Sequence, residues 1–158
     1  MPAIVANLWF DTQALEAAEF YVSVFPNSSV RAVSHYTEVG PGPAGSVLTV
    51  DFELDGTRFT AINGGPAFTF DEAVSFRIEC EDQAEIDRYW DALLAEGGEP
   101  SQCGWLKDRF GLSWQVVPKG MDELFADHDR ERADCAMTAM LAMVKIDLAA
   151  LQRAADAG

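Results

Sequence analysis

The chain lacks the features that mark several classes of protein. Its three cysteines, Cys80, Cys103 and Cys135, are odd in number and far apart, so neither a disulfide framework nor a zinc knuckle is indicated. No apolar run reaches the ~18 residues needed to cross a membrane, and no basic segment precedes an apolar stretch at the N-terminus. We therefore expect a cytoplasmic protein with no membrane partner.

Basic residues are also scarce. Eleven lysines and arginines stand against 26 aspartates and glutamates, which gives the 158-residue chain a net charge of −15. Nucleic acids and anionic membranes both need a basic surface, so this balance argues against either as a partner. The hydrophobic content of 49% is sufficient for a packed core in one domain or in two half-size modules.

What the chain does contain is a repeated order of elements. A strand-like run leads into a helix-like run, and about 70 residues later the same pair occurs again. The two strands are predicted at residues 4–10 and 74–80, and the two helices at residues 12–25 and 83–94. About three shorter strand-like runs follow each helix. This order predicts an α+β fold in which two βαβββ modules form one cupped mixed β-sheet.

Residues at the ends of both helices support their assignment. Asp11 is the predicted N-cap of the first helix, and Pro26 follows its end. Asp82 and Glu85 form a capping-box pattern at the start of the second helix, and a pair of glycines follows its end.

Alternation and turn residues predict the remaining strands. Asp55-Gly56 joins two alternating runs as a two-residue hairpin turn. The further strands are predicted at residues 30–36, 47–54, 57–63, 99–103, 105–109 and 113–117. The loop at residues 38–46, rich in Gly and Pro, is either a lid over a cavity or a long connection.

The composition changes near the C-terminus. Residues 1–118 are predicted to form the two-module domain, with modules at about residues 1–65 and 72–118. Residues 119–158, rich in Ala, Met, Leu and charge, are predicted to form a helical tail that covers an exposed face of the sheet or a partner subunit. Its first helix is marked by an apolar stripe of Met137, Met140, Leu141 and Val144, and its second by residues 146–155.

Strand alternation locates the cavity. In residues 113–117, Trp114 and Val116 oppose Gln115, so one face packs on a helix and the other lines the cup. The same reasoning applied to the other strands, with the neighbouring aromatic residues, gives the candidate ligand-binding set. These residues are Asn7, Trp9, Asn63, Phe68, Ser75, Arg77, Cys103, Trp105 and Gln115.

Several of these candidates have a second interpretation. Arg77 would pair with a ligand carboxylate or phosphate, or with an acidic side chain of the protein, namely Glu79, Asp51 or Glu53. Cys103 would be a reactive thiol if Lys107 or Arg109 activates it, or a buried inert cysteine. The aromatic residues would wall a pocket or belong to the core.

Longer motifs are similar to those of a known family. They are LWFDTQALEAAEFY, VFPNS, NGGPAFTF, SQCGWLKDRFG and SWQVVP, and they lie between residues 8 and 118. They resemble the PhnB-like branch of the glyoxalase, bleomycin-resistance and extradiol-dioxygenase superfamily, also called the vicinal oxygen chelate superfamily. Many members of this branch carry the name 3-demethylubiquinone-9 3-methyltransferase. The resemblance implies the two-module cupped sheet and a homodimer.

Enzymes of this superfamily hold a divalent metal with four side chains, one from each of four central strands. The resemblance places Val5, Asn63 or Ala61, Ser75 and Gln115 nearest those positions. Only Gln115 is a residue type that the family uses. Valine has no donor atom, and serine and amides are poor ligands for the softer divalent ions. We therefore predict neither a metal nor another cofactor.

The function that the sequence favours is binding of a small organic molecule in the cup. A conventional S-adenosylmethionine-dependent methyltransferase needs a Gly-rich strand-to-helix turn, and no such unit is present. One alternative is a metal-dependent vicinal-oxygen-chelate enzyme with atypical ligands, such as Gln115 with Glu79 or Asp51. A second is a structural or regulatory dimer. Whether the protein is an enzyme stays open at this stage.

Overall fold

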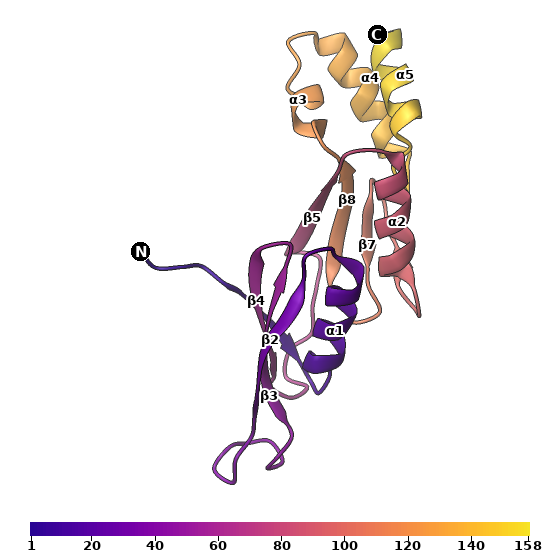
Figure 1. Ribbon diagram of the computed structural model, residues 1–158. Coiled ribbons are helices and arrows are strands. Elements are labelled where there is room, and N and C mark those ends of the chain that lie inside the picture. The colour runs from indigo at the N-terminus through magenta and orange to yellow at the C-terminus, as the bar shows by residue number, and fades with distance from the viewer. The chain divides into compact units, whose positions relative to one another are not determined.

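In a computed structural model of the protein, which describes residues 1–158, the chain divides into two compact units (Figure 1). The first comprises residues 1–70 and the second residues 71–158. Each unit contains a four-stranded mixed sheet. None of the helices has both the length and the apolar character that crossing a membrane requires.

The first unit is one βαβββ module. Its sheet has the strand order β1-β4-β3-β2, in which β1 runs parallel to β4 and the other neighbours are antiparallel. The elements are β1 (Ala6–Phe10), α1 (Ala14–Val24), β2 (Ser29–His35), β3 (Val47–Leu54) and β4 (Thr57–Asn63). Asp55 and Gly56 both have positive φ, 43° and 82°, which confirms the predicted tight hairpin turn between β3 and β4.

The core of this unit lies between α1 and one face of the sheet. Val50 and Phe52 are 0% and 1% exposed, whereas Thr49 and Asp51, which point to the opposite face, are half-buried. The buried residues of α1 are mostly alanines, which let the helix approach the strands closely, and its Tyr21 ring stacks on Phe52. The face opposite the helix is called the open face below.

The predicted start of the first helix is wrong. Asp11 does not cap it; α1 begins at Ala14, and the preceding Gln13 makes no side-chain capping bond. The Ala14 N–H donates instead to the side-chain oxygen of Asn63 at 2.8 Å. A residue distant in sequence therefore supplies the acceptor that the helix needs.

The second unit repeats the same module. Its sheet has the order β5-β8-β7-β6, with β5 parallel to β8. The elements are β5 (Ser75–Cys80), α2 (Gln83–Leu94), β6 (Glu99–Pro100), β7 (Trp105–Lys107) and β8 (Ser113–Pro118). The repetition confirms the predicted α+β fold of two βαβββ modules, although β6 and β7 are shorter than expected.

The amphipathic pattern of α2 is confirmed. Its buried residues are Ile86, Tyr89, Trp90 and Leu93. At its start, Asp82 accepts a 2.9 Å hydrogen bond from the N–H of Glu85, as the capping-box pattern predicts. In a capping box the Glu85 carboxylate would accept from the N–H of Asp82. It accepts instead from the N–H of Glu81, one residue earlier.

Three tail helices follow, α3 (Met121–Phe125), α4 (Arg130–Leu141) and α5 (Leu148–Ala157). The apolar stripe predicted for this region is wrong in part. α4 ends at Leu141, which is 61% exposed, and the buried residues of α4 are Ala133 and Ala136. The helices α4 and α5 lie side by side (Figure 1). The buried residues of α5 are Leu151 and Ala155, so alanines and one leucine, rather than methionines, are buried in these two helices.

Hydrogen bonds to backbone groups of the tail attach it to the second module. The side chain of Gln83, at the start of α2, donates to the carbonyl of Ile146 and accepts from the N–H of Leu148. The N–H groups of Cys103 and Gly104 donate to the carbonyls of Met143 and Val144 at 2.9 and 2.8 Å. The segment between α4 and α5 is thus held by α2 and by the turn before β7.

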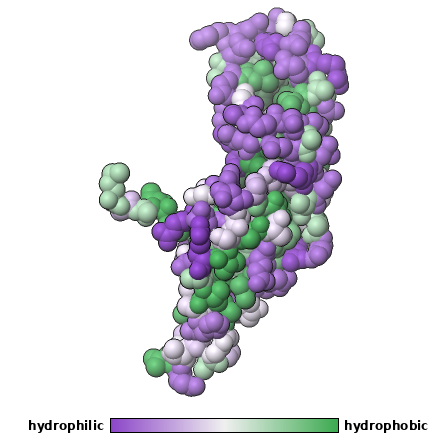
Figure 2. Space-filling model, viewed as in Figure 1, coloured by the Kyte–Doolittle hydropathy of each residue, from purple (hydrophilic) through white to green (hydrophobic).

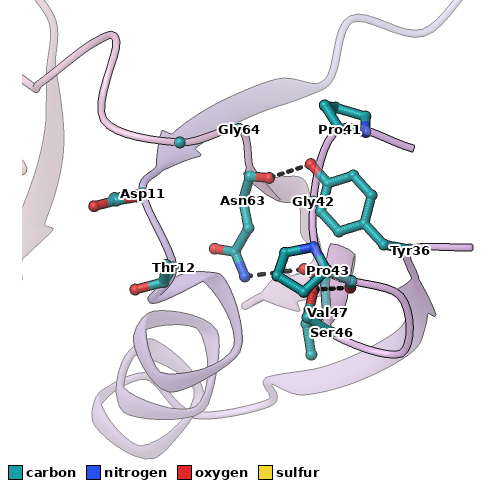
Figure 3. Close-up of a pocket in the computed structure, with 11 residues that line it drawn as sticks. Asp11, Thr12, Tyr36, Pro41, Gly42, Pro43, Ser46, Val47, Asn63 and Gly64 are labelled. Atoms are coloured by element: carbon teal, nitrogen blue, oxygen red, sulfur yellow. Dashed lines mark hydrogen bonds between the residues drawn. The ribbon is translucent and has the colours of Figure 1, made fainter. Parts of the chain in front are cut away.

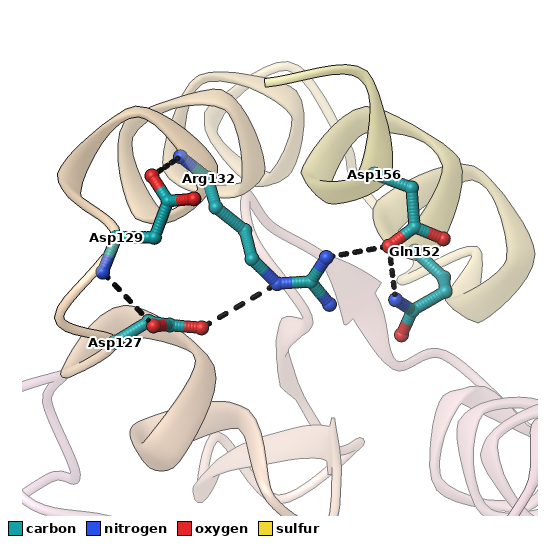
Figure 4. Close-up of polar contacts among 5 residues, drawn as sticks. All are labelled: Asp127, Asp129, Arg132, Gln152 and Asp156. Carbon is teal, nitrogen blue, oxygen red and sulfur yellow. Dashed lines mark hydrogen bonds and ion pairs between the residues drawn. The ribbon is translucent and has the colours of Figure 1, made fainter.

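Arg132 links the tail helices to one another (Figure 4). Its guanidinium lies 2.5 Å from Asp156 of α5 and 3.4 Å from Asp127, while Asp129 caps α4. The hydrogen bond from Arg132, and then that from Gln152, lowers the pKa of the Asp156 carboxyl. These helices are largely hydrophilic on the surface shown in Figure 2, whereas hydrophobic residues gather over the first unit.

Candidate functional site

The open face of the first sheet carries a row of side chains that includes Trp9. Strand register places Trp9 of β1 beside Ile62 of β4, and Ile62 beside Thr49 of β3. Their neighbours Leu8, Phe10 and Ala61 are buried on the helix side. The predicted placement of Trp9 on the open face therefore agrees with the alternation, and Asn7 lies two residues earlier, beside Thr60.

The indole of Trp9 is fixed on three sides. Its Nε1–H donates to the carbonyl of Gly65 at 2.9 Å, and Phe68 meets it edge-on at 5.0 Å between ring centroids. Gly64 packs so closely on the indole that a Cβ there would overlap the ring. Phe68 itself is 65% exposed. Gly64, Gly65 and Phe68 of the motif Asn63–Phe70 thus form a wall against the Trp9 indole.

A pocket of about 360 Å³ adjoins this wall. Trp9 and Tyr36 supply aromatic surface, and most of the other lining residues are apolar. These include Leu48, Ile62 and Pro41, with His35 and Gly64 also in the lining. The volume falls in the range of small-ligand sites, about 300 to 1,000 Å³. We call this the Trp9 pocket.

A second pocket of about 370 Å³ also has Tyr36 in its lining (Figure 3). It is lined by the loop between β2 and β3, by the end of β4, and by Asp11 and Thr12 before α1. Tyr36 donates its hydroxyl to the backbone carbonyl of Asn63 at 2.6 Å. We call this the Asn63 pocket.

The face predicted for Asn63 is corrected by the structure. Asn63 follows Phe59 and Ala61 on the buried, helix-facing side of β4, and it is 9% exposed. Its amide accepts from Ala14 and donates to the carbonyl of Val47, so both polar atoms have partners within the fold. Asn63 borders a pocket, but it does so away from the open face, and its amide is occupied.

The open face of the second sheet brings together four of the predicted residues. Register places Arg77 beside Gln115 and Gln115 beside Trp105 on adjacent strands. The Gln115 Nε2–H donates to Ser75 Oγ at 2.9 Å. Trp114 and Val116, which alternate with Gln115, are 3% and 0% exposed. A cation, an amide and an aromatic ring therefore lie in one row across β5, β8 and β7.

Arg77 is engaged by acidic side chains of the protein. Its guanidinium donates to Asp122 of α3 at 2.8 Å and to Glu79 at 2.5 Å. These two hydrogen bonds, that from Asp122 first, raise the pKa of Arg77. The internal ion pair that the sequence left as one alternative is present, although Asp122 rather than Asp51 or Glu53 is the second partner.

The cysteines lie apart from these rows. Cys103 occupies a turn with a positive φ of 59°, next to the segment between α4 and α5. Cys80 is 0% exposed, and burial raises the pKa of its thiol to about 12, with the Glu85 charge adding to the effect. A thiol with so high a pKa is protonated near neutral pH and is a poor nucleophile.

The four positions related to the superfamily's metal ligands do not form a metal site of that kind. Val5 precedes β1 and has no donor atom, and the Asn63 amide is used by the fold. Ser75 and Gln115 are bonded to each other, and neither is a strong ligand for a transition metal. No group of three or more His, Cys, Asp or Glu side chains lies close enough together to hold an ion.

Two important residues were not among the sequence candidates. Tyr36 lines both pockets, and the only sequence signal for it is its position before the Gly- and Pro-rich loop. Asp108, 2% exposed, accepts hydrogen bonds from the N–H groups of Phe110 and Leu112 and from the indole of Trp114. Its place in the turn before β8 makes it a structural centre of the second unit.

Comparison with known proteins identifies the family. A model of the family described as 3-demethylubiquinone-9 3-methyltransferase matches residues 2–117 of the chain. The chain belongs to this family. The family match ends before the three tail helices begin. Among curated proteins, none matches the sequence.

Solved structures agree with the family and the fold. The PhnB protein from Bacillus cereus is 35% identical with a TM-score of 0.66, over 73% of this chain and 99% of that protein. A protein from Pseudomonas aeruginosa is 23% identical with a TM-score of 0.60, over 75% of this chain and 98% of that one.

A more distant likeness extends to an antibiotic resistance protein. The fosfomycin resistance protein FosX from Listeria monocytogenes, solved with Mn(II) and sulfate, is 14% identical with a TM-score of 0.54. The match covers 79% of this chain and 95% of FosX. At that identity the likeness concerns the fold alone. It shows that the present chain has the glyoxalase and bleomycin-resistance fold.

Proposed function

We propose that the protein binds a small organic molecule on the open faces of its sheets, without the four-ligand metal site of the superfamily's enzymes. The observation that carries this proposal is the Trp9 pocket. It combines a suitable volume with aromatic and aliphatic walls, and Trp9 is held in place by the Gly65 carbonyl and Phe68. A fixed aromatic wall binds a flat apolar group with little loss of side-chain entropy.

The second sheet supports the same function. Gln115 lies at the centre of its open face, where its amide can exchange the bond to Ser75 for one to a ligand. Trp105 lies beside it and supplies a second aromatic surface. Polar groups that are few in number and set among aromatic surfaces are typical of small-molecule sites.

The family's descriptive name refers to a methyltransferase, but the local structure favours binding over that chemistry. A conventional S-adenosylmethionine site uses a Gly-rich turn between its first strand and helix. Here the connection from β1 to α1 is Asp11, Thr12 and Gln13, with no glycine, and the Ala14 N–H is already bonded to Asn63. No methyl-donor site is therefore part of the proposal.

A fragment screen by ligand-observed NMR tests the proposal. Wild-type protein and Trp9→Leu, which keeps apolar bulk without the ring, would be screened with the same set of small aromatic and aliphatic compounds. We expect several hits on the wild type and loss of most of them on Trp9→Leu. Phe20→Leu on α1 is the matched control, and it should retain the hits. A screen with no hits, or with hits unaffected by Trp9→Leu, would contradict the proposal.

A further inference from the structure

The Trp9 pocket and the Asn63 pocket share one wall. Tyr36, Pro41 and Gly64 line both of them. Of these three residues only Tyr36 has a large side chain. Tyr36 directly follows β2, and its side chain extends toward β4, where its hydroxyl donates a hydrogen bond to the Asn63 carbonyl (Figure 3). The two cavities, about 360 and 370 Å³, therefore adjoin each other at these three residues, and Tyr36 is the only aromatic residue that lines both.

The Tyr36 ring is held by the loop that follows it. A Cβ on Gly40 would lie 2.6 Å from the ring, and one on Gly42 would overlap it, so glycine at both positions lets the loop pack against the ring. Backbone hydrogen bonds from Tyr36 to Ser46 and from Gly45 back to Tyr36, both 2.8 Å, close the loop at its base. Tyr36 and the loop thus form one compact piece.

This piece is only lightly attached to the rest of the unit. No residue from 37 to 46 is buried, so moving the loop exposes little apolar surface. The hydroxyl of Tyr36 is tied to β4 by a hydrogen bond to the Asn63 carbonyl. Breaking that bond frees the Tyr36 hydroxyl from β4 at a small cost.

The two cavities also differ in chemistry. The Trp9 pocket is aromatic and aliphatic, whereas hydroxyl and backbone groups line part of the Asn63 pocket, including Thr12 and Ser46. The only ionisable side chain besides Tyr36 in the Asn63 pocket is Asp11, and no basic residue lines it. A negatively charged group is therefore disfavoured there, while an uncharged or cationic polar group is not.

From this arrangement we propose that the two pockets are compartments of one elongated site, with Tyr36 as the gate between them. The ligand class is a molecule with an aromatic ring for the Trp9 compartment and an uncharged or cationic polar end for the Asn63 compartment. This inference rests on the proposed function, because the Trp9 pocket is the site named there.

Probes of different length and charge test the gate. Benzyl alcohol reaches one compartment only, whereas phenylbutanol and phenylbutylamine can reach both, and phenylbutyrate has the same length with a negative end. Binding is measured by NMR titration, with the Trp9 indole N–H reporting the first compartment and the Asn63 side-chain amide the second. Tyr36→Phe removes the bond to Asn63 and keeps the ring, and Tyr89→Phe in α2 is the matched control.

We expect Tyr36→Phe to bind phenylbutanol and phenylbutylamine about 2- to 10-fold more tightly, as the loss of one net hydrogen bond predicts, and benzyl alcohol without change. Only the long probes should shift the Asn63 amide, and phenylbutyrate should bind at least about 10-fold more weakly than phenylbutanol. Tyr89→Phe should match the wild type. Gly42→Ala, which displaces the ring by overlap, provides a second variant with the same expected selectivity.

Equal effects of Tyr36→Phe and Gly42→Ala on short and long probes, or none on either, would overturn the gate. Binding of phenylbutyrate as tight as that of phenylbutanol would overturn the ligand class. In those cases the probes still shift the Trp9 indole, and the proposed function stands. If no probe shifts the Trp9 indole in any of the proteins, the proposed function fails, and the inference fails with it.

Discussion

The side-chain oxygen of Asn63 accepts a 2.8 Å hydrogen bond from the backbone N–H of Ala14, 49 residues earlier. The bond joins the last residue of β4 to the first residue of α1, and the same amide donates to the Val47 carbonyl of β3 at 3.1 Å. Asn63 therefore holds three elements of the first unit together at the edge of a pocket. Its role in that unit is structural.

Asn63→Ala should lower the free energy of unfolding by about 2 to 4 kcal/mol, because it removes a helix cap and leaves the Val47 carbonyl without its donor. Gln13→Ala is the control, since Gln13 precedes the helix and makes no capping bond. Urea unfolding followed by circular dichroism gives both values. Equal effects of the two substitutions would show that the remote cap does not stabilise α1.

Gln115→Ala and Trp114→Ala, neighbours on opposite faces of β8, should have opposite consequences. Trp114 is 3% exposed and bonded to Asp108, so its loss should cost about 3 to 5 kcal/mol of stability. Gln115→Ala should change the melting temperature little and weaken a ligand by about 2- to 10-fold, the value of one hydrogen bond.

Thermal unfolding and titration with a fragment-screen hit measure both effects on the same samples. If Gln115→Ala unfolded the protein while ligand affinity in the folded fraction stayed unchanged, the assignment of faces in the second sheet would be inverted. The proposed contribution of Gln115 to the site would then be lost.

The tail should loosen in acid through Asp156. The pKa of its carboxyl in the folded protein lies below the ordinary value of 3.8, because Arg132 and then Gln152 donate hydrogen bonds to the charged form. A group with a lowered folded pKa stabilises the protein above its unfolded pKa, and this contribution is lost as the pH falls through the folded pKa. The contribution of Asp156 is therefore complete near neutral pH and disappears in the acid range below about pH 4.

Hydrogen exchange of α4 and α5 in wild type and Asp156→Asn, at several pH values, checks this expectation. The variant should exchange faster than the wild type near neutral pH, and the difference should shrink toward about pH 2.5. Asp134→Asn, also on α4 but outside the Arg132 cluster, is the control. A difference that persists unchanged in acid would show that the ion pair does not stabilise the tail.

We expect the protein to be a homodimer. β2 is an edge strand of the first sheet, and the tail leaves Leu141 and Val144 61% and 42% exposed. Free strand edges and exposed apolar side chains are commonly covered by a twofold partner. Light scattering at micromolar concentration should give about twice the chain mass of 17.3 kDa. A species of single-chain mass across the concentration range would contradict this expectation.

Local sequence signals predicted most of the fold. The α2 boundaries, the strands β3 and β4 and the Asp55-Gly56 turn follow from short-range patterns, because capping, alternation and turn residues act within a few positions. The start of α1 could not be predicted in this way. Its cap comes from Asn63, and no local pattern near Asp11 reports a bond from so distant a residue.

The same limit applies to the candidate site. Alternation placed Trp9 and Gln115 on the open faces, because strand parity is a local property. It placed Asn63 on the wrong face, since the residue closes β4 and turns toward α1. The roles of Tyr36 and Asp108 depend on contacts made by loops, whose paths the sequence does not specify.

Binding without a metal is the central claim, and one titration tests it most directly. Protein treated with a chelator and dialysed would be titrated with phenylbutanol by calorimetry, alone and after addition of one equivalent of manganese, nickel or zinc. The account predicts binding in the metal-free protein, with a dissociation constant that each metal changes by less than about twofold. Binding that occurs only after a metal has been added would contradict it.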